Sequence, residues 1–262
     1  KKILLISGLI PILIYPNIYW SLMGMEVAIL SPIVSFIFCT FVYNEESYLR
    51  LENYKEKLSI FILFFFFFLG QTIRPDFFLY NFAIIISIFI CRKNLNNFYG
   101  NLKFLFASTI GTTSGWLFIY FWRGIYFEDN IPNTYRLKVL GINPFKQIIS
   151  GIIYTIPFLF ESFFILFLLF LLLRKSTIKK SFSLTLSSSI FFIFLAYQIR
   201  VGGDPWTYWR IMATPITILV FALLKECINK EFSFLLFFKN KVNIINIQKN
   251  NILDKKLKSF SL

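Results

Sequence analysis

Histidine is absent from this chain of 262 residues, and cysteine and acidic residues are scarce. Without an imidazole group, the chain cannot use histidine as a general base or as a metal ligand. The three cysteines, Cys39, Cys91 and Cys227, lie in or at the ends of apolar runs. The sequence therefore predicts neither a disulfide bond nor a cysteine metal site.

Long apolar runs take the place of the missing polar residues. Hydrophobic side chains make up 57% of the chain and aromatic ones 21%, and the mean hydropathy is +0.68. A soluble domain of this length has no core large enough to bury so much apolar surface. Several runs are long enough to cross a hydrocarbon layer of roughly 30 Å as helices, and they lack the alternation of barrel strands. The sequence predicts an all-α polytopic membrane protein.

The apolar runs predict about eight transmembrane helices. They cover roughly residues 3–19, 27–43, 58–73, 77–91, 103–122, 148–172, 182–199 and 211–224. The runs 58–73 and 77–91 are short, so a hairpin that does not fully cross is an alternative. Residues 1–225 are expected to form the transmembrane domain, and 226–262 a basic cytoplasmic tail.

A net charge of +14 raises the possibility of nucleic-acid binding, but the charges lie in loops beside the apolar runs. A bias of lysine and arginine towards the cytoplasmic side explains them more simply, and it places both termini of this chain inside. Four loops richer in varied polar residues then share the outer face. They are 20–26, 73–77, 123–146 and 200–210. The sequence therefore predicts a site at the outer membrane–water boundary.

The last of these loops carries the densest set of candidate binding residues. Arg200 and Arg210 flank the Gly202–Gly203 turn, and Asp204 lies at its tip. Guanidinium groups suit a phosphate, glycines permit close backbone approach, and a carboxylate can orient a hydroxyl or act as a base. The alternative is structural, with an arginine–aspartate pair joining two helix ends inside an aromatic belt.

The other outer loops allow similar pairs of interpretations. Arg74 and Asp76 flank a proline in a turn that is either part of a binding site or a salt-bridged connection. Glu26 stands at the start of a helix, where a carboxylate also favours the helix dipole. Arg136 and Lys138 in the 123–146 loop meet either a lipid phosphate or the headgroups around a surface helix.

Taken together, four segments resemble a known family of membrane glycosyltransferases. They are "WSLMGMEVAIL", "IRPDFFLY", "IPNTYRLKVLG" and "VGGDPWTYWRIMATP". In this order and spacing they are similar to motifs of the terminal β-(1→2)-arabinofuranosyltransferase family of mycobacterial cell walls, which belongs to the GT-C superfamily. The resemblance implies a GT-C-like bundle in the bacterial plasma membrane.

The resemblance also implies an activity, which is transfer of a sugar, such as a pentose, from a polyprenyl-phosphate donor to a cell-envelope glycan or glycolipid. Donor or acceptor binding would involve Arg200, Asp204, Arg210, Arg74 and Asp76. The residues bordering the sugar would include Asn133, Thr134 and Lys138, with Arg136 between them. The reaction would be metal-independent or would use a divalent cation only loosely.

The chain departs from the family pattern at its start. The usual catalytic carboxylate follows the first span of these enzymes, and "GMEV" matches a later loop, so we expect a longer protein with an upstream span and acid. Otherwise catalysis would rest on Glu26, Asp76 or Asp204. Two alternatives remain open, a transporter or flippase of lipid-linked sugars and a non-catalytic membrane fragment.

Overall fold

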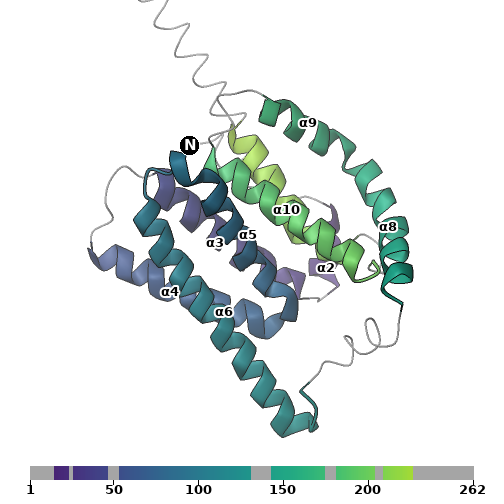
Figure 1. Cartoon of the computed structure of the whole chain (residues 1–262), viewed down its shortest axis with the longest axis horizontal. Coiled ribbons are helices and arrows are strands. Elements are labelled where there is room, and N and C mark those ends of the chain that lie inside the picture. Colours follow the sequence, from purple (N-terminus) through teal and green to yellow (C-terminus); the bar gives the residue numbers. More distant parts are fainter. Residues whose placement is uncertain are drawn as a thin grey trace, which may run out of the picture. The chain divides into compact units, whose positions relative to one another are not determined.

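All regular elements in the described part of the chain are helices (Figure 1). The computed structural model describes residues 15–23, 26–46, 53–130, 143–174, 181–203 and 209–226. The chain divides into two compact units, Lys1–Ala222 and Leu223–Leu262, and nearly all described residues belong to the first. The predicted all-α class is confirmed for these residues.

The described helices follow one another along the chain. In chain order they are α2 (Tyr15–Leu22), α3 (Val27–Glu46), α4 (Asn53–Ile73), the short turn η2 (Pro75–Phe77), α5 (Phe78–Cys91), the short turn η3 (Arg92–Asn94), α6 (Phe98–Phe127), α8 (Pro144–Glu161), α9 (Phe163–Arg174), α10 (Phe182–Arg200) and a last helix over residues 210–226.

The predicted count of about eight membrane spans is not confirmed. Five helices of the described part are long and apolar enough to cross a membrane: Val27–Glu45, Glu56–Ile73, Pro75–Asn94, Phe98–Phe127 and Phe182–Arg200. A sixth results if α8 and α9 form one broken span. Most of the first predicted span lies outside the described residues. The last helix is about 26 Å long at 1.5 Å per residue, slightly less than a hydrocarbon core.

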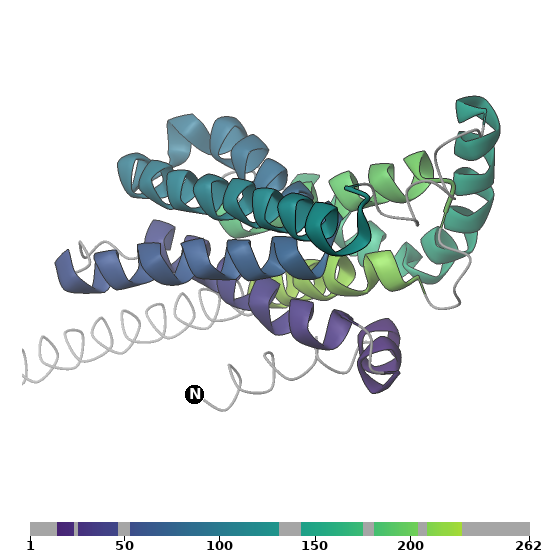
Figure 2. The same ribbon diagram turned by 90° about the horizontal axis from the view of Figure 1, so that it is seen from below.

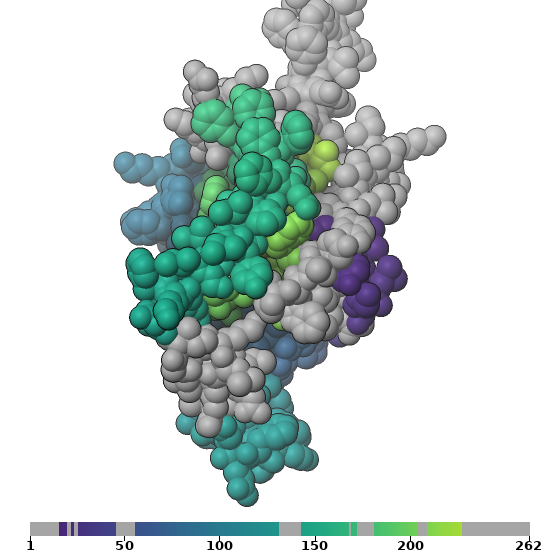
Figure 3. All heavy atoms as spheres, turned by 90° about the vertical axis from the view of Figure 1, so that its right-hand side faces the viewer, coloured from purple at the N-terminus to yellow at the C-terminus, as the bar shows by residue number. Residues whose placement is uncertain are grey.

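The single predicted span over 148–172 is two helices. The chain bends by 76° between α8 and α9, around Ser162. Pro157 lies inside α8, where its ring and missing N–H weaken the helical ladder one turn before the bend. Figure 3 shows α8 and α9 as a continuous band on one face, with part of the 210–226 helix visible beside them.

Helices α4 and α6 pack against each other at close range. Gly111 and Gly115 face α4, where a Cβ atom on Gly111 would clash with the Phe64 carbonyl oxygen and one on Gly115 would lie 2.7 Å from that of Phe68. Two glycines four residues apart form a flat stripe that lets two membrane helices approach. Figure 2 shows α4 and α6 running side by side.

Helix α6 continues past the end of α4. Its 30 residues span about 45 Å, more than a hydrocarbon core. The carboxyl-terminal end of α6 projects beyond the neighbouring helices (Figure 1). Stacked aromatic pairs on successive turns, such as Trp122 with Tyr126, sustain this extension. The predicted 123–146 loop is therefore too long, because 123–127 belong to α6 and 144–146 to α8.

Among the described loop residues, Glu26, Arg74 and Arg210 meet at one end of the bundle. At the other end, the buried Glu45 carboxylate accepts hydrogen bonds from Asn97 N and Asn101 Nδ2 at the start of α6. This carboxylate stabilises the α6 amino terminus through its partial positive charge.

Replacing Gly111 with leucine should separate α4 from α6, because a side chain there collides with the α4 backbone. We expect a loss of at least about 1–3 kcal/mol in the free energy of unfolding, measured by thermal unfolding in detergent. Thr113→Val on the exposed side of α6 is the matched control and should change little. Equal effects of the two substitutions would contradict this packing.

Candidate functional site

The turn between α4 and α5 brings an arginine and a carboxylate into direct contact. Arg74 has extended backbone after the last residue of α4, and Pro75 opens η2. The Arg74 Nε and Nη2 atoms donate to Oδ1 and Oδ2 of Asp76 at 2.7 and 2.6 Å. This bidentate pair confirms the salt-bridged turn that the sequence allowed, and it engages both Asp76 oxygens.

Glu26 lies between two arginines that come from distant parts of the chain. Its Oε1 atom is 4.0 Å from Arg74 Nη1 and 3.7 Å from Arg210 Nη1. Glu26 directly precedes α3, and its carbonyl accepts the first helical hydrogen bonds from Ile29 and Leu30. Arg210 opens the last helix. Three of the four predicted outer segments therefore meet here, as a charge cluster of Glu26, Arg74, Asp76 and Arg210.

Apolar contacts between the adjoining helices hold the charge cluster together. Val27, the residue after Glu26, and Ala213, one turn after Arg210, are buried against each other, and Tyr19 of α2 packs on both. The starts of α3 and of the last helix are thus in direct contact. This contact brings Glu26 and Arg210 together.

The side chains of the charge cluster are largely buried, and the cluster has no net formal charge. The exposed fraction of the Asp76 side chain is 8%, of Arg74 15%, of Arg210 21% and of Glu26 23%. Two guanidinium groups face two carboxylates. Burial alone would lower the pKa of Arg74, but the charge and hydrogen bonds of Asp76, with Tyr80 and Glu26, raise that pKa above its ordinary value. Arg74 stays charged.

An uncharged polar track continues from the charge cluster into the bundle. Ser31 donates to Asn17 Oδ1 at 2.6 Å and lies 3.0 Å from the Thr214 hydroxyl. Thr214 also lies close to Tyr80, which interacts electrostatically with Arg74. The track therefore joins α2, α3, α5 and the last helix.

Sequence reasoning missed these track residues, although a signal was present. Tyr80 and Thr214 stand four residues after Asp76 and Arg210, one helical turn deeper on the same face. Polar groups inside apolar helices are costly and usually find partners in the bundle interior. The spacing alone thus gave reason to include both residues.

The Gly-Gly turn closes the carboxyl end of α10. Gly202 and Gly203 both have φ of 85°, which confirms the need for glycine there. Their N–H groups donate to the carbonyls of Ile199 and Gln198 and so cap α10. In this arrangement the two N–H groups are used by the helix end rather than by an anion.

Arg200 contacts α8 and not the carboxylates of the charge cluster. Its Nη1 atom donates to Gln147 Oε1 at 2.9 Å, and Ser150 Oγ donates to the Gly202 carbonyl at 3.1 Å. Gly151 lies directly against the Ile199 backbone. The Gly-Gly turn is therefore fixed on the first turns of α8.

Several of the site residues predicted from the sequence lie outside the described residues, so the structural description of the site does not include them. They are Asp204, Asn133, Thr134, Arg136 and Lys138. In the described segments, no three acidic or cysteine side chains are grouped so that they could hold a metal ion. Binding of a divalent cation therefore stays a prediction, and no ligands for it are assigned among these described residues.

Gln198 is a buried polar residue near the carboxyl end of α10. Its carboxamide is fully buried, and neither of its polar atoms has a hydrogen-bond partner among the described residues. Helices α5 and α10 are antiparallel, since the ring centroids of Tyr80 and Phe194 are 4.4 Å apart and Cys91 lies close to Thr185. One turn beyond Phe194, Gln198 therefore lies level with the turn that holds Asp76.

Comparisons with models of known protein families, with curated proteins and with solved structures found no match for this chain. The family resemblance noted in the sequence therefore stays a prediction, and the charge cluster is interpreted from its own geometry.

Replacing Arg74 with leucine should destabilise the protein by about 3–5 kcal/mol, because Asp76 would keep a buried charge without its partner. The double variant R74L/D76L should recover most of this loss. As control, Lys103→Leu breaks an exposed ion pair with Glu56 and should cost no more than about 1 kcal/mol. Thermal unfolding distinguishes these outcomes, and a single variant as mild as the control would contradict a buried pair.

Gln198→Leu should raise the unfolding temperature, because it removes a buried amide that has no partner, worth about 1–3 kcal/mol. Gln147→Leu, equally buried but bonded to Arg200, should lower it. A lower unfolding temperature for Gln198→Leu would show that its amide is hydrogen bonded in the folded protein.

Proposed function

We propose that this chain belongs to an integral-membrane glycosyltransferase of GT-C type. It would transfer a sugar, such as a pentose, from a polyprenyl-phosphate donor to a cell-envelope glycan. The site would face the extracytoplasmic side of the bacterial plasma membrane, with both ends of this chain in the cytoplasm. The proposal rests on the sequence motifs and on the charge cluster.

The observation that carries the proposal is the convergence of three motif segments on Glu26. Arg74 and Arg210 reach the same carboxylate oxygen within 4.0 Å, although their segments are far apart in the sequence. Placing four charges at the end of an apolar bundle costs desolvation energy, which a purely structural connection between helices could avoid with apolar side chains. A function that uses charge explains why such groups are gathered there.

The charge cluster suits an anionic leaving group. Guanidinium groups bind phosphate oxygens, and since Asp76 already holds Nε and Nη2 of Arg74, Arg210 is the better placed of the two arginines to contact a phosphate. As a sugar leaves its lipid phosphate, negative charge develops on the phosphate, and fixed donors in a site of low polarity stabilise it. The prenyl chain would lie along the apolar helices below.

We assign different roles to the two carboxylates of the charge cluster. Asp76 is the more deeply buried, and Arg74 engages both of its oxygens, so we assign it to positioning Arg74. Glu26 is more exposed, and its two ion-pair contacts are both made through Oε1. Glu26 is therefore the better placed to accept a proton from an acceptor hydroxyl.

Arg210→Ala should weaken binding of a polyprenyl-phosphate pentose about tenfold or more, the usual value of a hydrogen bond to a charged group. Retention of radiolabelled donor by the protein in nanodiscs measures this. Arg210→Lys tests whether charge alone suffices. Arg92→Ala, at the opposite end of the bundle, is the matched control, and binding equal to that control would remove Arg210 from the site.

A second measurement separates the proposed reaction from its alternatives. In liposomes that contain donor and acceptor, Glu26→Gln should abolish transfer while donor binding persists. Movement of the donor across the bilayer without transfer would support the transporter alternative. Neither binding nor transfer by the unaltered protein would support a non-catalytic role.

A further inference from the structure

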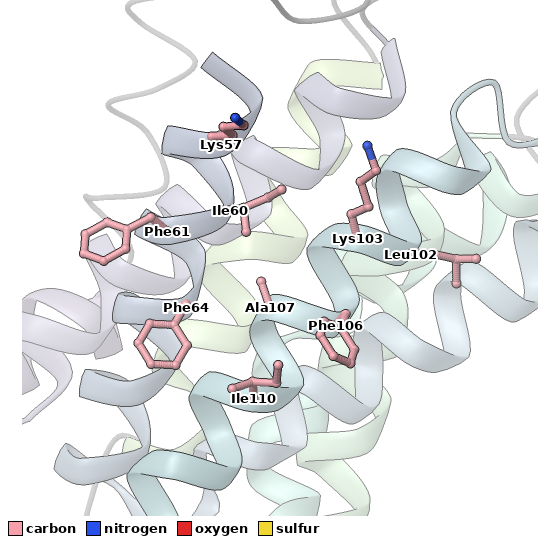
Figure 4. A pocket seen from close by; sticks show the side chains of 9 residues that line it. All are labelled: Lys57, Ile60, Phe61, Phe64, Leu102, Lys103, Phe106, Ala107 and Ile110. Atoms are coloured by element: carbon pink, nitrogen blue, oxygen red, sulfur yellow. The ribbon is translucent and has the colours of Figure 1, made fainter. Parts of the chain in front are cut away.

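A cavity of about 660 Å³ lies between α4 and α6, at the end of the bundle away from the charge cluster. Its lining is apolar except for Lys57 of α4 and Lys103 of α6 (Figure 4). Both lysine side chains lie at the same end of the cavity, with Ile60 and Phe106 between them and Ile110. We name this feature the α4–α6 groove.

The groove results from the size of the side chains on one face of α6. Positions 115, 111, 107 and 103 follow one another at intervals of four and carry glycine, glycine, alanine and lysine. The two glycines allow contact with the α4 backbone. The groove lies on the Lys103 side of these glycines, where Ala107 and Lys103 form part of its lining.

The lysine end of the groove carries a net positive charge. Lys103 Nζ is 2.6 Å from Glu56 Oε1, which neutralises one of the two ammonium groups. Lys57 is exposed and adds a second positive charge beside this pair. Lysines at the ends of membrane helices extend their ammonium groups to the interface, where lipid phosphates lie.

We propose that the α4–α6 groove binds an anionic phospholipid, with its phosphate at Lys57 and Lys103 and one acyl chain along the apolar lining. Charge complementarity selects an anionic headgroup over a zwitterionic one. The apolar lining favours a lipid acyl chain, because Phe61 and Phe106 expose 63% and 69% of their surface beside the groove. Because the groove lies at the other end of the bundle, this site is separate from the proposed donor site and does not depend on it.

Native mass spectrometry of the whole chain tests this proposal, with phosphatidylglycerol competing against phosphatidylcholine. The double variant K57Q/K103Q should retain phosphatidylglycerol about fivefold to thirtyfold less than the unaltered protein. The control K93Q/K146Q removes the same charge at positions outside the groove. An equal loss in both doubles would overturn the proposal, because it would show a general attraction of lipid to positive charge.

A second pair of measurements tests the role of the acyl chain. F61N/F106N keeps both lysines and should lower retention of long-chain phosphatidylglycerol, with thermal unfolding as the check on folding. Inorganic phosphate should not displace the lipid from the unaltered protein. Displacement by phosphate, or full retention by F61N/F106N, would overturn the assignment of the lining to an acyl chain.

Discussion

The Arg74 guanidinium is the charge on which the arrangement of this end of the bundle depends. A buried cation must be paired, and Arg74 finds Asp76 on its own turn and Glu26 at the start of α3. Glu26 in turn contacts Arg210. Each charged side chain is therefore compensated by a neighbouring charge of opposite sign. These ion pairs also fix the helices that supply them relative to one another.

The two ends of the bundle carry different sets of polar side chains. The charge cluster continues into the uncharged track through Tyr80 and Thr214, whereas the other end carries the carboxylate of Glu45 on the amino terminus of α6 and the two groove lysines. Most of the described spans between them is apolar. The close contact of α4 and α6 at Gly111 fixes these two helices against each other between the two ends.

The amino-acid sequence was enough to predict the helical class and the loop segments that meet at the charge cluster. It did not predict the side-chain contacts between them. Length and hydropathy located α3, α4, α5 and α10 well, because apolar runs and polar loops alternate clearly there. They placed the end of α6 too early, since stacked aromatic residues continue a helix without long aliphatic runs. The partners of Gln147 and Ser31 depend on the three-dimensional packing of distant helices, which no local pattern reveals.

A double-mutant cycle on Glu26 and Arg210 tests the convergence of these segments most directly. The free energy of unfolding is measured for the unaltered protein, Glu26→Gln, Arg210→Gln and the double variant. Because the two side chains are in contact, the cycle should give a coupling energy of about 0.5–3 kcal/mol. Additive effects, within about 0.3 kcal/mol, would contradict the contact and with it the charge cluster.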